Sequence, residues 1–176
     1  MIKELEIDGE VFRFDSTVDQ ILRRGLIDPY MRTRAKNLWV VLFPYIFWSA
    51  RYQCAICIPR WFLSDLASIP RPVRLLIPVN GRHRLNAVAH DLLYFLQPEG
   101  ITRHMADVMY LDFNKMSGVS FTNRRSQHAG LCVGGWVGWR NNKGHGSVSE
   151  ADRIWYQKEY PQLGLPIEDS FSGIVV

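Results

Sequence analysis

A histidine and an aspartate stand next to each other in the stretch RHRLNAVAHDLLYFLQ, which spans residues 82–97. An imidazole can act as a base near neutral pH, and a carboxylate can orient an imidazole or hold a hard cation. His90 and Asp91 are therefore the first candidates for chemistry in this chain. A structural interpretation competes with this one, in which the histidine makes core contacts and the aspartate pairs with an arginine.

The same stretch has the period of a helix with two different stripes. The polar or ring-bearing stripe consists of His83, Asn86, His90 and Tyr94, and the apolar stripe consists of Leu85, Ala89, Leu92 and Leu96. Asp91 lies about 100° around the helix from His90, among apolar neighbours, where a carboxylate needs a partner. We expect this partner to come from another part of the chain.

Size and charge limit the classes of protein to consider. The chain has 176 residues, of which 47% are hydrophobic, and this is enough for one well-filled core, so we expect a single domain over residues 1–176. The net charge of +4 comes mainly from arginines, some of them in pairs such as Arg23-Arg24 and Arg124-Arg125. Such pairs suit phosphates, anionic lipids or acidic protein surfaces, but they are too short to favour a dedicated nucleic-acid binder.

The cysteines and the apolar segments argue against a disulfide framework, a secretory signal and a transmembrane segment. Cys54, Cys57 and Cys132 do not make a disulfide framework, and a strand would place Cys54 and Cys57 on opposite faces. The first ten residues lack the apolar run of a secretory signal, which predicts synthesis in the cytoplasm. The longest apolar run, residues 38–47, is about half as long as a membrane-spanning helix, so we expect no transmembrane segment.

The N-terminal part of the chain is predicted to be mostly sheet. Residues 2–14 alternate around Asp8-Gly9, a dipeptide typical of tight turns, and predict a β-hairpin. A Ser-Thr pair predicts a short helix over residues 18–24, and residues 38–62 are rich in β-branched and aromatic types that predict two more strands. Three prolines make residues 60–82 an irregular crossover.

The C-terminal part is predicted to be helical. After the helix of residues 82–97, helices are expected over residues 102–118, 123–140 and 149–160. A methionine stripe in the first of these is typical of core packing. Glycines at every fourth position of the second allow another helix to approach closely, and its two tryptophans leave an interfacial or membrane-touching use open. The chain therefore belongs to the α+β class, with an N-terminal antiparallel β-sheet packed against three or four C-terminal helices.

Four motifs in a fixed order carry a resemblance to a known family. They are SDLASIPR (residues 64–71), AVAHDLLY (87–94), ITRHMADVMYLDFNKM (101–116) and GGWVGWR (134–140). The series resembles a phage and prophage family filed as Domain of Unknown Function 1353. The family-like core covers about residues 61–140, and residues 141–176 form a C-terminal extension. The resemblance implies a phage origin and assigns no reaction.

Carried over position by position, the resemblance singles out seven polar residues. They are Asp65, Ser68, Arg71, His90, Asp91, Tyr94 and Asp107. The first three are candidates for a structural or substrate-binding role, and the positions around His90 are candidates for catalysis.

The helix that bears His90 also looks like the catalytic helix of secreted phospholipases A2. This likeness implies that His90 is the base, that Asp107 orients it, and that Asp91 and Asp65 hold a divalent cation such as calcium, with Tyr94 completing the set. The sequence lacks the Gly-rich calcium loop and the flanking disulfides of those enzymes.

The competing hypothesis is a structural lock. In it, Asp91 and Asp65 anchor Arg71 or Arg82 and hold the proline-rich crossover against the helices.

These observations lead to two functional hypotheses. In the first, the protein is a bacteriophage virion-associated component of the tail or neck with a hydrolase-like His-Asp site. It would be made in the host cytoplasm and then enter the virion beside other phage structural proteins, including further copies of itself. In the alternative, it is a small hydrolase that acts on the bacterial envelope, on either phospholipid or peptidoglycan.

Overall fold

The structure is a computed structural model that describes residues 1–29, 38–66, 83–141, 146–169 and 173–175. The strands are β1 (Ile2–Ile7), β2 (Glu10–Asp15), β3 (Gln20–Arg23), β4 (Ile27–Pro29), β5 (Trp39–Val41), β6 (Tyr45–Ser49), β7 (Cys54–Ile58), β8 (Leu63–Ser64) and β9 (Gly173–Val175). The helices are α2 (Arg84–Leu96), α3 (Arg103–Met116), α4 (Phe121–Asn141), α5 (Glu150–Glu159) and the short 3-10 helix η1 (Pro161–Leu163).

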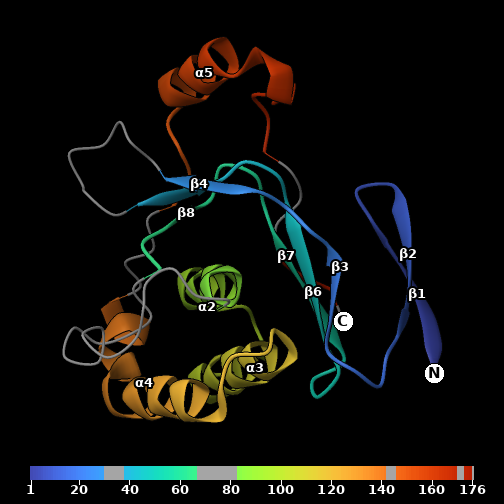
Figure 1. The fold of residues 1–176 in the computed structure, drawn as a ribbon, viewed down its shortest axis with the longest axis vertical. Helices are drawn as coiled ribbons and strands as arrows, with labels where there is room; N and C mark the ends of the chain where they lie inside the picture. Colours follow the sequence, from blue (N-terminus) through green and yellow to red (C-terminus); the bar gives the residue numbers. More distant parts are fainter. Residues whose placement is uncertain (30–37, 67–82, 142–145, 170–172, 176) are drawn as a thin grey trace.

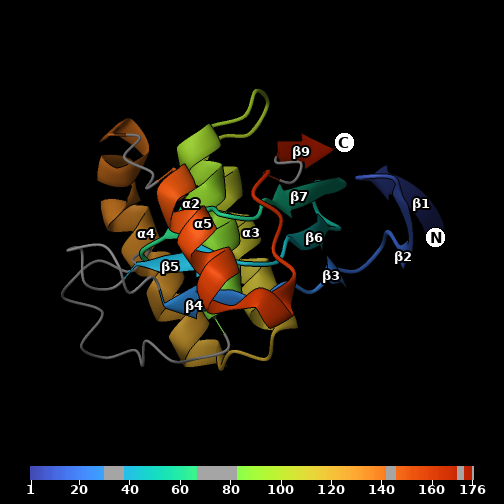
Figure 2. The same ribbon diagram turned by 90° about the horizontal axis from the view of Figure 1, so that it is seen from above.

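The strands of the described segments form three antiparallel sheets, and four α-helices lie between β8 and β9 in the chain, which confirms the α+β class. The first sheet is the predicted hairpin β1-β2, the second has the order β3-β6-β7-β9, and the third has the order β4-β5-β8. Figures 1 and 2 show the second sheet between the hairpin on one side and α2 and α3 on the other.

The predicted helix over residues 18–24 is wrong, because β3 occupies most of this stretch. Gln20 and Ile21 pair with Trp48 and Phe47 of β6, and the edge of that sheet supplies backbone partners that a helix of two turns would not have. The Asp15 carboxylate accepts hydrogen bonds from the backbone N–H and the hydroxyl of Thr17, so the local polar groups make a turn.

The second sheet is buried on both faces, so β6 and β7 are buried along their whole length. Phe47 and Cys54 belong to the core shared with α2 and α3, whereas Trp48 and Cys57 belong to the core shared with the hairpin. The expected placement of the two cysteines on opposite faces is confirmed. At the edge of this sheet, β9 pairs with β7 and docks the C-terminal end.

The helices enclose the core that holds the candidate residues. Met109 and Phe113 of α3 are buried in this core, and Met105 and Met116 pack against it, which confirms that the methionine stripe is a packing stripe. A separate apolar cluster joins α5 to β5 and β8 through Tyr156 and Trp61, whose rings are 5.7 Å apart. Figure 1 shows α5 at the end of the molecule opposite α4, remote from the candidate site.

No helix in the described segments is long and apolar enough to cross a membrane.

Candidate functional site

The Asp107 carboxylate is the centre of a buried polar cluster. It accepts hydrogen bonds from three donors, namely Nε2 of His90 at 2.9 Å, the hydroxyl of Tyr94 at 2.6 Å and the guanidinium of Arg103 at 2.8 Å. Because an ionised carboxylate only accepts, Nε2 of His90 carries the proton in this contact. Only 1% of the Asp107 side chain and 2% of the His90 side chain are exposed. We refer to these four residues as the Asp107 cluster.

Helical spacing explains why the four side chains meet. His90 and Tyr94 are four residues apart on α2, and Arg103 and Asp107 are four residues apart on α3, so each pair lies on one face of its helix. Arg103 also donates to the backbone carbonyl of Leu131 on α4 at 3.2 Å. The Asp107 cluster therefore joins three helices.

The electrostatics of the Asp107 cluster favour a permanent negative charge on Asp107. Burial by itself would raise the pKa of this carboxyl group, but the hydrogen bonds from His90 and Tyr94 and the nearby Arg103 lower it below its ordinary value of 3.8. The pKa of Tyr94 is raised strongly, first by burial and then by its bond to the carboxylate. Asp107 is therefore an acceptor, and the Tyr94 hydroxyl remains a donor, at neutral pH.

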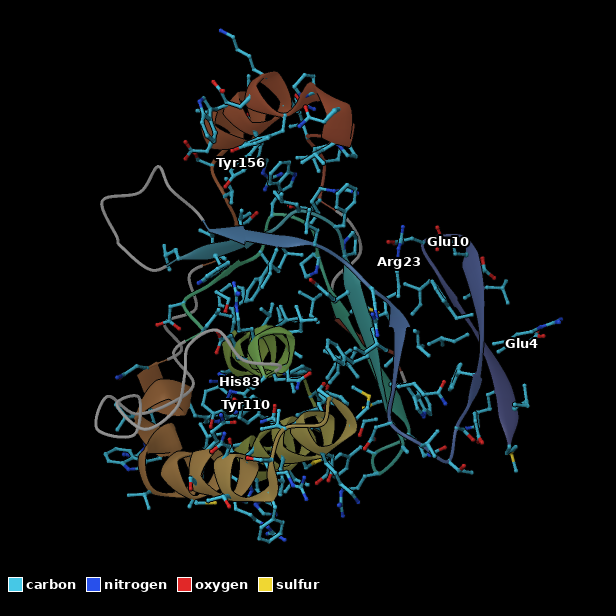
Figure 3. The ribbon with its side chains drawn as sticks, viewed as in Figure 1. Glu4, Glu10, Arg23, His83, Tyr110 and Tyr156 are labelled. Atoms are coloured by element: carbon cyan, nitrogen blue, oxygen red, sulfur yellow. The ribbon has the colours of Figure 1, made fainter. Side chains whose placement is uncertain are left out.

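A second layer of polar side chains lies beside the Asp107 cluster. The ring of Tyr110 lies 5.2 Å from that of His90, and its hydroxyl donates to Oε1 of Gln127 at 3.1 Å. Asn114 donates to the same oxygen at 3.0 Å and accepts from Asn86 at 2.8 Å. Figure 3 shows Tyr110 and His83 in the interior on the side of α2 that faces α3 and α4. The predicted polar stripe of α2 thus faces other helices.

Close packing of α4 seals the Tyr94 side of the cluster. A Cβ atom at Gly135 would lie 2.6 Å from the Tyr94 hydroxyl and 3.2 Å from the Arg103 guanidinium, so no larger residue fits without displacing them. A Cβ atom at Gly138 would lie 3.5 Å from the Tyr94 ring, an ordinary contact. A close contact within the fold is therefore present, but the glycine that requires it is Gly135, which is not one of the predicted glycines spaced by four.

Asp91 makes a different set of contacts from those of the Asp107 cluster. Its carboxylate accepts a short hydrogen bond from the hydroxyl of Ser64 on β8, and that hydroxyl accepts from the backbone N–H of Leu66 at 3.1 Å. Asp65 follows directly and is half-buried. Ser68 and Arg71 lie outside the described residues, as does Arg82. The expected partner of Asp91 from another part of the chain is confirmed.

The predicted calcium ligands are Asp91 and Asp65, and their surroundings can be compared with the needs of that ion. Calcium takes about six to eight oxygen ligands, usually with several carboxylates. Among the residues described, no three His, Cys, Asp or Glu side chains come together in a way that could hold a metal ion. The described side chains around Asp91 and Asp65 therefore do not fit a calcium cage.

Two contributors to the site were not predicted from the sequence. Arg103 is the third donor to Asp107, and its position four residues before Asp107 on a predicted helix was the signal that could have revealed it. Ser64 is the partner of Asp91, and no local pattern indicates this pairing because it joins a strand to a helix that follows later in the chain.

The fold and the site together define an α+β domain in which a buried carboxylate joins three helices. Comparison with protein families shows that this chain belongs to the family described as "Protein of unknown function (DUF1353)", which matches residues 39–131, more than half of the chain. Comparisons with curated proteins and with solved structures found no match. The family match begins at β5, earlier than the expected boundary near residue 61, and it contains all four members of the Asp107 cluster.

Proposed function

We propose that this protein is a virion-associated structural component of a bacteriophage, in the tail or neck, and that the Asp107 cluster stabilises its helical layer. The observation that carries the structural role of the cluster is the saturation of Asp107 by His90, Tyr94 and Arg103. The phage assignment rests on the ordered motif series from SDLASIPR to GGWVGWR and on its resemblance to phage and prophage proteins.

The burial of the cluster supports a structural role for a physical reason. A catalytic base must reach the proton that it removes, directly or through one water, whereas His90 and Asp107 are almost fully buried. Removing one partner from such a buried ionic cluster would leave an uncompensated charge or donor, so each member depends on the others. The cluster therefore has the properties of a lock between helices.

The outer face of α4 supports a role in assembly. Val133, Trp136 and Val137 are spaced as neighbours on one helical face and are 79%, 51% and 45% exposed. Contiguous exposed apolar residues mark surfaces that bind other proteins. In this proposal, α4 contacts another structural protein of the particle or a second copy of the chain.

Disruption of the gene in the phage or prophage genome tests the proposal. We expect particles with a missing or incomplete tail or neck in electron micrographs, and restoration by the wild-type gene. The His90→Gln variant should also restore assembly, because its amide nitrogen can replace Nε2 of the imidazole as donor to Asp107. Normal particles without the gene would contradict the proposal.

The alternative function, a hydrolase of the bacterial envelope, draws support from one distance. Nε2 of His90 lies 2.9 Å from Oδ1 of Asp107, and a carboxylate in this position orients an imidazole so that Nδ1 can act as the base. Purified protein would then release fatty acid from phospholipid vesicles or fragments from peptidoglycan, with and without added calcium.

The two functions predict opposite results for one variant. His90→Gln should abolish a hydrolase, because an amide is not a base, while Asp112→Asn on α3, outside the Asp107 cluster, should leave it active. The hydrolase hypothesis would be removed if the folded wild-type protein released nothing from either substrate between about pH 6 and pH 8, where a histidine base can act.

A further inference from the structure

A small basic cavity lies where the β6-β7 turn meets the end of α3 and the start of α4, a corner that can be followed in Figure 1. Its volume is about 230 Å³. It is lined by Arg51, Leu111, Asp112, Lys115, Arg124 and Arg125. These residues come from three separate parts of the chain, and none of them belongs to the Asp107 cluster.

The charges around this basic cavity are unbalanced. Asp112 is the one carboxylate among its lining residues, and both of its oxygens are engaged by Arg51, at 2.6 and 3.2 Å. Lys115, Arg124 and Arg125 therefore line the cavity with no second carboxylate among the described lining residues, and Asp19, which interacts with Lys115, lines the neighbouring hollow. Cations gathered within one Debye length, about 8 Å at physiological salt, repel one another. An anion in the cavity would relieve this repulsion.

One of the arginines, Arg124, is held in place. The guanidinium of Arg124 donates to the backbone carbonyl of Val119 at 3.0 Å and lies 5.2 Å from the centre of the Phe121 ring. The guanidinium of Arg125, an exposed side chain, lies 5.4 Å from the centre of the same ring. Because the guanidinium of Arg124 is already positioned, an incoming anion has one fewer flexible side chain to order.

We propose that this basic cavity binds the phosphate group of a small phosphorylated molecule. Guanidinium groups match the oxygens of phosphate with paired hydrogen bonds, and a lysine adds a compact charge. A cavity of this size fits one phosphate better than the row of phosphates in a nucleic acid, which needs an extended basic stripe.

The neighbouring hollow indicates what the rest of the ligand is like. This second hollow has a volume of about 460 Å³ and shares Arg51, Asp112 and Lys115 with the basic cavity. It is also lined by Thr17, Val18, Asp19, Ala50 and Met116. The Asp19 carboxylate can accept from a hydroxyl group and disfavours a second phosphate, and the apolar side chains can lie against a sugar ring. These features fit a sugar phosphate.

Calorimetric titration of the full chain with ribose 5-phosphate tests the proposal, with ribose as the uncharged control. The test variant is Lys115→Gln combined with Arg125→Gln, and the matched control is Arg140→Gln combined with Lys158→Gln, which removes the same charge from exposed sites elsewhere. The titrations are run at physiological salt to screen general attraction, and thermal unfolding checks that each variant is folded.

The expected result is binding of ribose 5-phosphate but not ribose, weakened roughly tenfold or more in the test variant and less than about twofold in the control. Equal weakening in both variants would mean general electrostatic attraction and would overturn the proposal. The absence of binding would also overturn the proposal. So would binding only to phosphatidylglycerol vesicles or only to duplex DNA, because the phosphate would then belong to a lipid or a nucleic acid and not to a small molecule.

Discussion

Replacement of Asp107 by asparagine separates a structural cluster from a catalytic one. Asparagine has nearly the same shape as aspartate, so the change removes charge and one acceptor without opening a cavity. Its carbonyl oxygen can still accept from His90 or Tyr94, but its NH₂ group would face the guanidinium of Arg103, which is a donor as well. Of the three bonds to Asp107, one is therefore lost and two are weakened.

The size of the effect follows from these three bonds. Hydrogen bonds to a charged group contribute about 1.5–3 kcal/mol each and neutral ones about 0.5–1.5 kcal/mol, so one lost and two weakened bonds should cost about 3.5–6 kcal/mol of unfolding free energy in Asp107→Asn. For a chain of this length the melting temperature should fall by roughly 10 °C. Urea unfolding followed by circular dichroism measures the first quantity and calorimetry the second.

The matched control is Asp112→Asn on the same helix. Asp112 also loses a two-bond contact with an arginine, but the Arg51 side chain is 56% exposed, so the expected cost is below about 1 kcal/mol. Equal costs for the two variants, or a stabilised Asp107→Asn protein, would refute the structural role, because groups held in place for catalysis often lower stability.

Two further predictions follow from the same packing. Gly135→Ala should lower the free energy of unfolding by about 1–3 kcal/mol, because the new methyl group would clash with the Tyr94 hydroxyl. Gly138→Ala should leave it unchanged or raise it by up to about 1 kcal/mol. Urea unfolding of both variants measures the difference, and equal effects would contradict the contact at Gly135. The pKa of His83 is lowered from 6.5, first by burial and then by Arg84, so the unfolded state binds its proton more readily and stability should decline as the pH falls below 6.5. The His83→Gln variant should lose less unfolding free energy than the wild type between about pH 7.5 and pH 5.5, two values on either side of the ordinary pKa of histidine. Urea unfolding at both pH values measures this loss. An equal loss in both proteins would contradict a role for His83 in the decline.

The elements that could be predicted from sequence are those with strong local signals. Asp8 and Gly9 both have positive φ, at 53° and 75°, as the predicted turn of the hairpin requires, and the helical periods of α2 and α3 identified their buried faces. The strand β3 was missed because its conformation is determined by pairing with β6, about 25 residues further along the chain. The local sequence around β3 does not include this partner.

The candidate site was predictable to a similar degree. The order of the motifs placed His90, Tyr94 and Asp107 in one set, and the structure brings these three side chains together. The contact between Ser64 and Asp91 depends on how the third sheet meets α2, and the need for glycine at position 135 depends on the depth at which Tyr94 is buried. Both are properties of packing between distant segments, for which the sequence alone offers no spacing rule.

The most direct test of the proposed function is a protein inventory, by quantitative mass spectrometry, of phage particles purified through two successive density gradients. The proposal predicts that the chain is present in a fixed ratio to the tail or neck proteins and that this ratio stays constant from the first gradient to the second. Abundant protein in the infected cells together with its absence from the purified particles would contradict the role as a virion component.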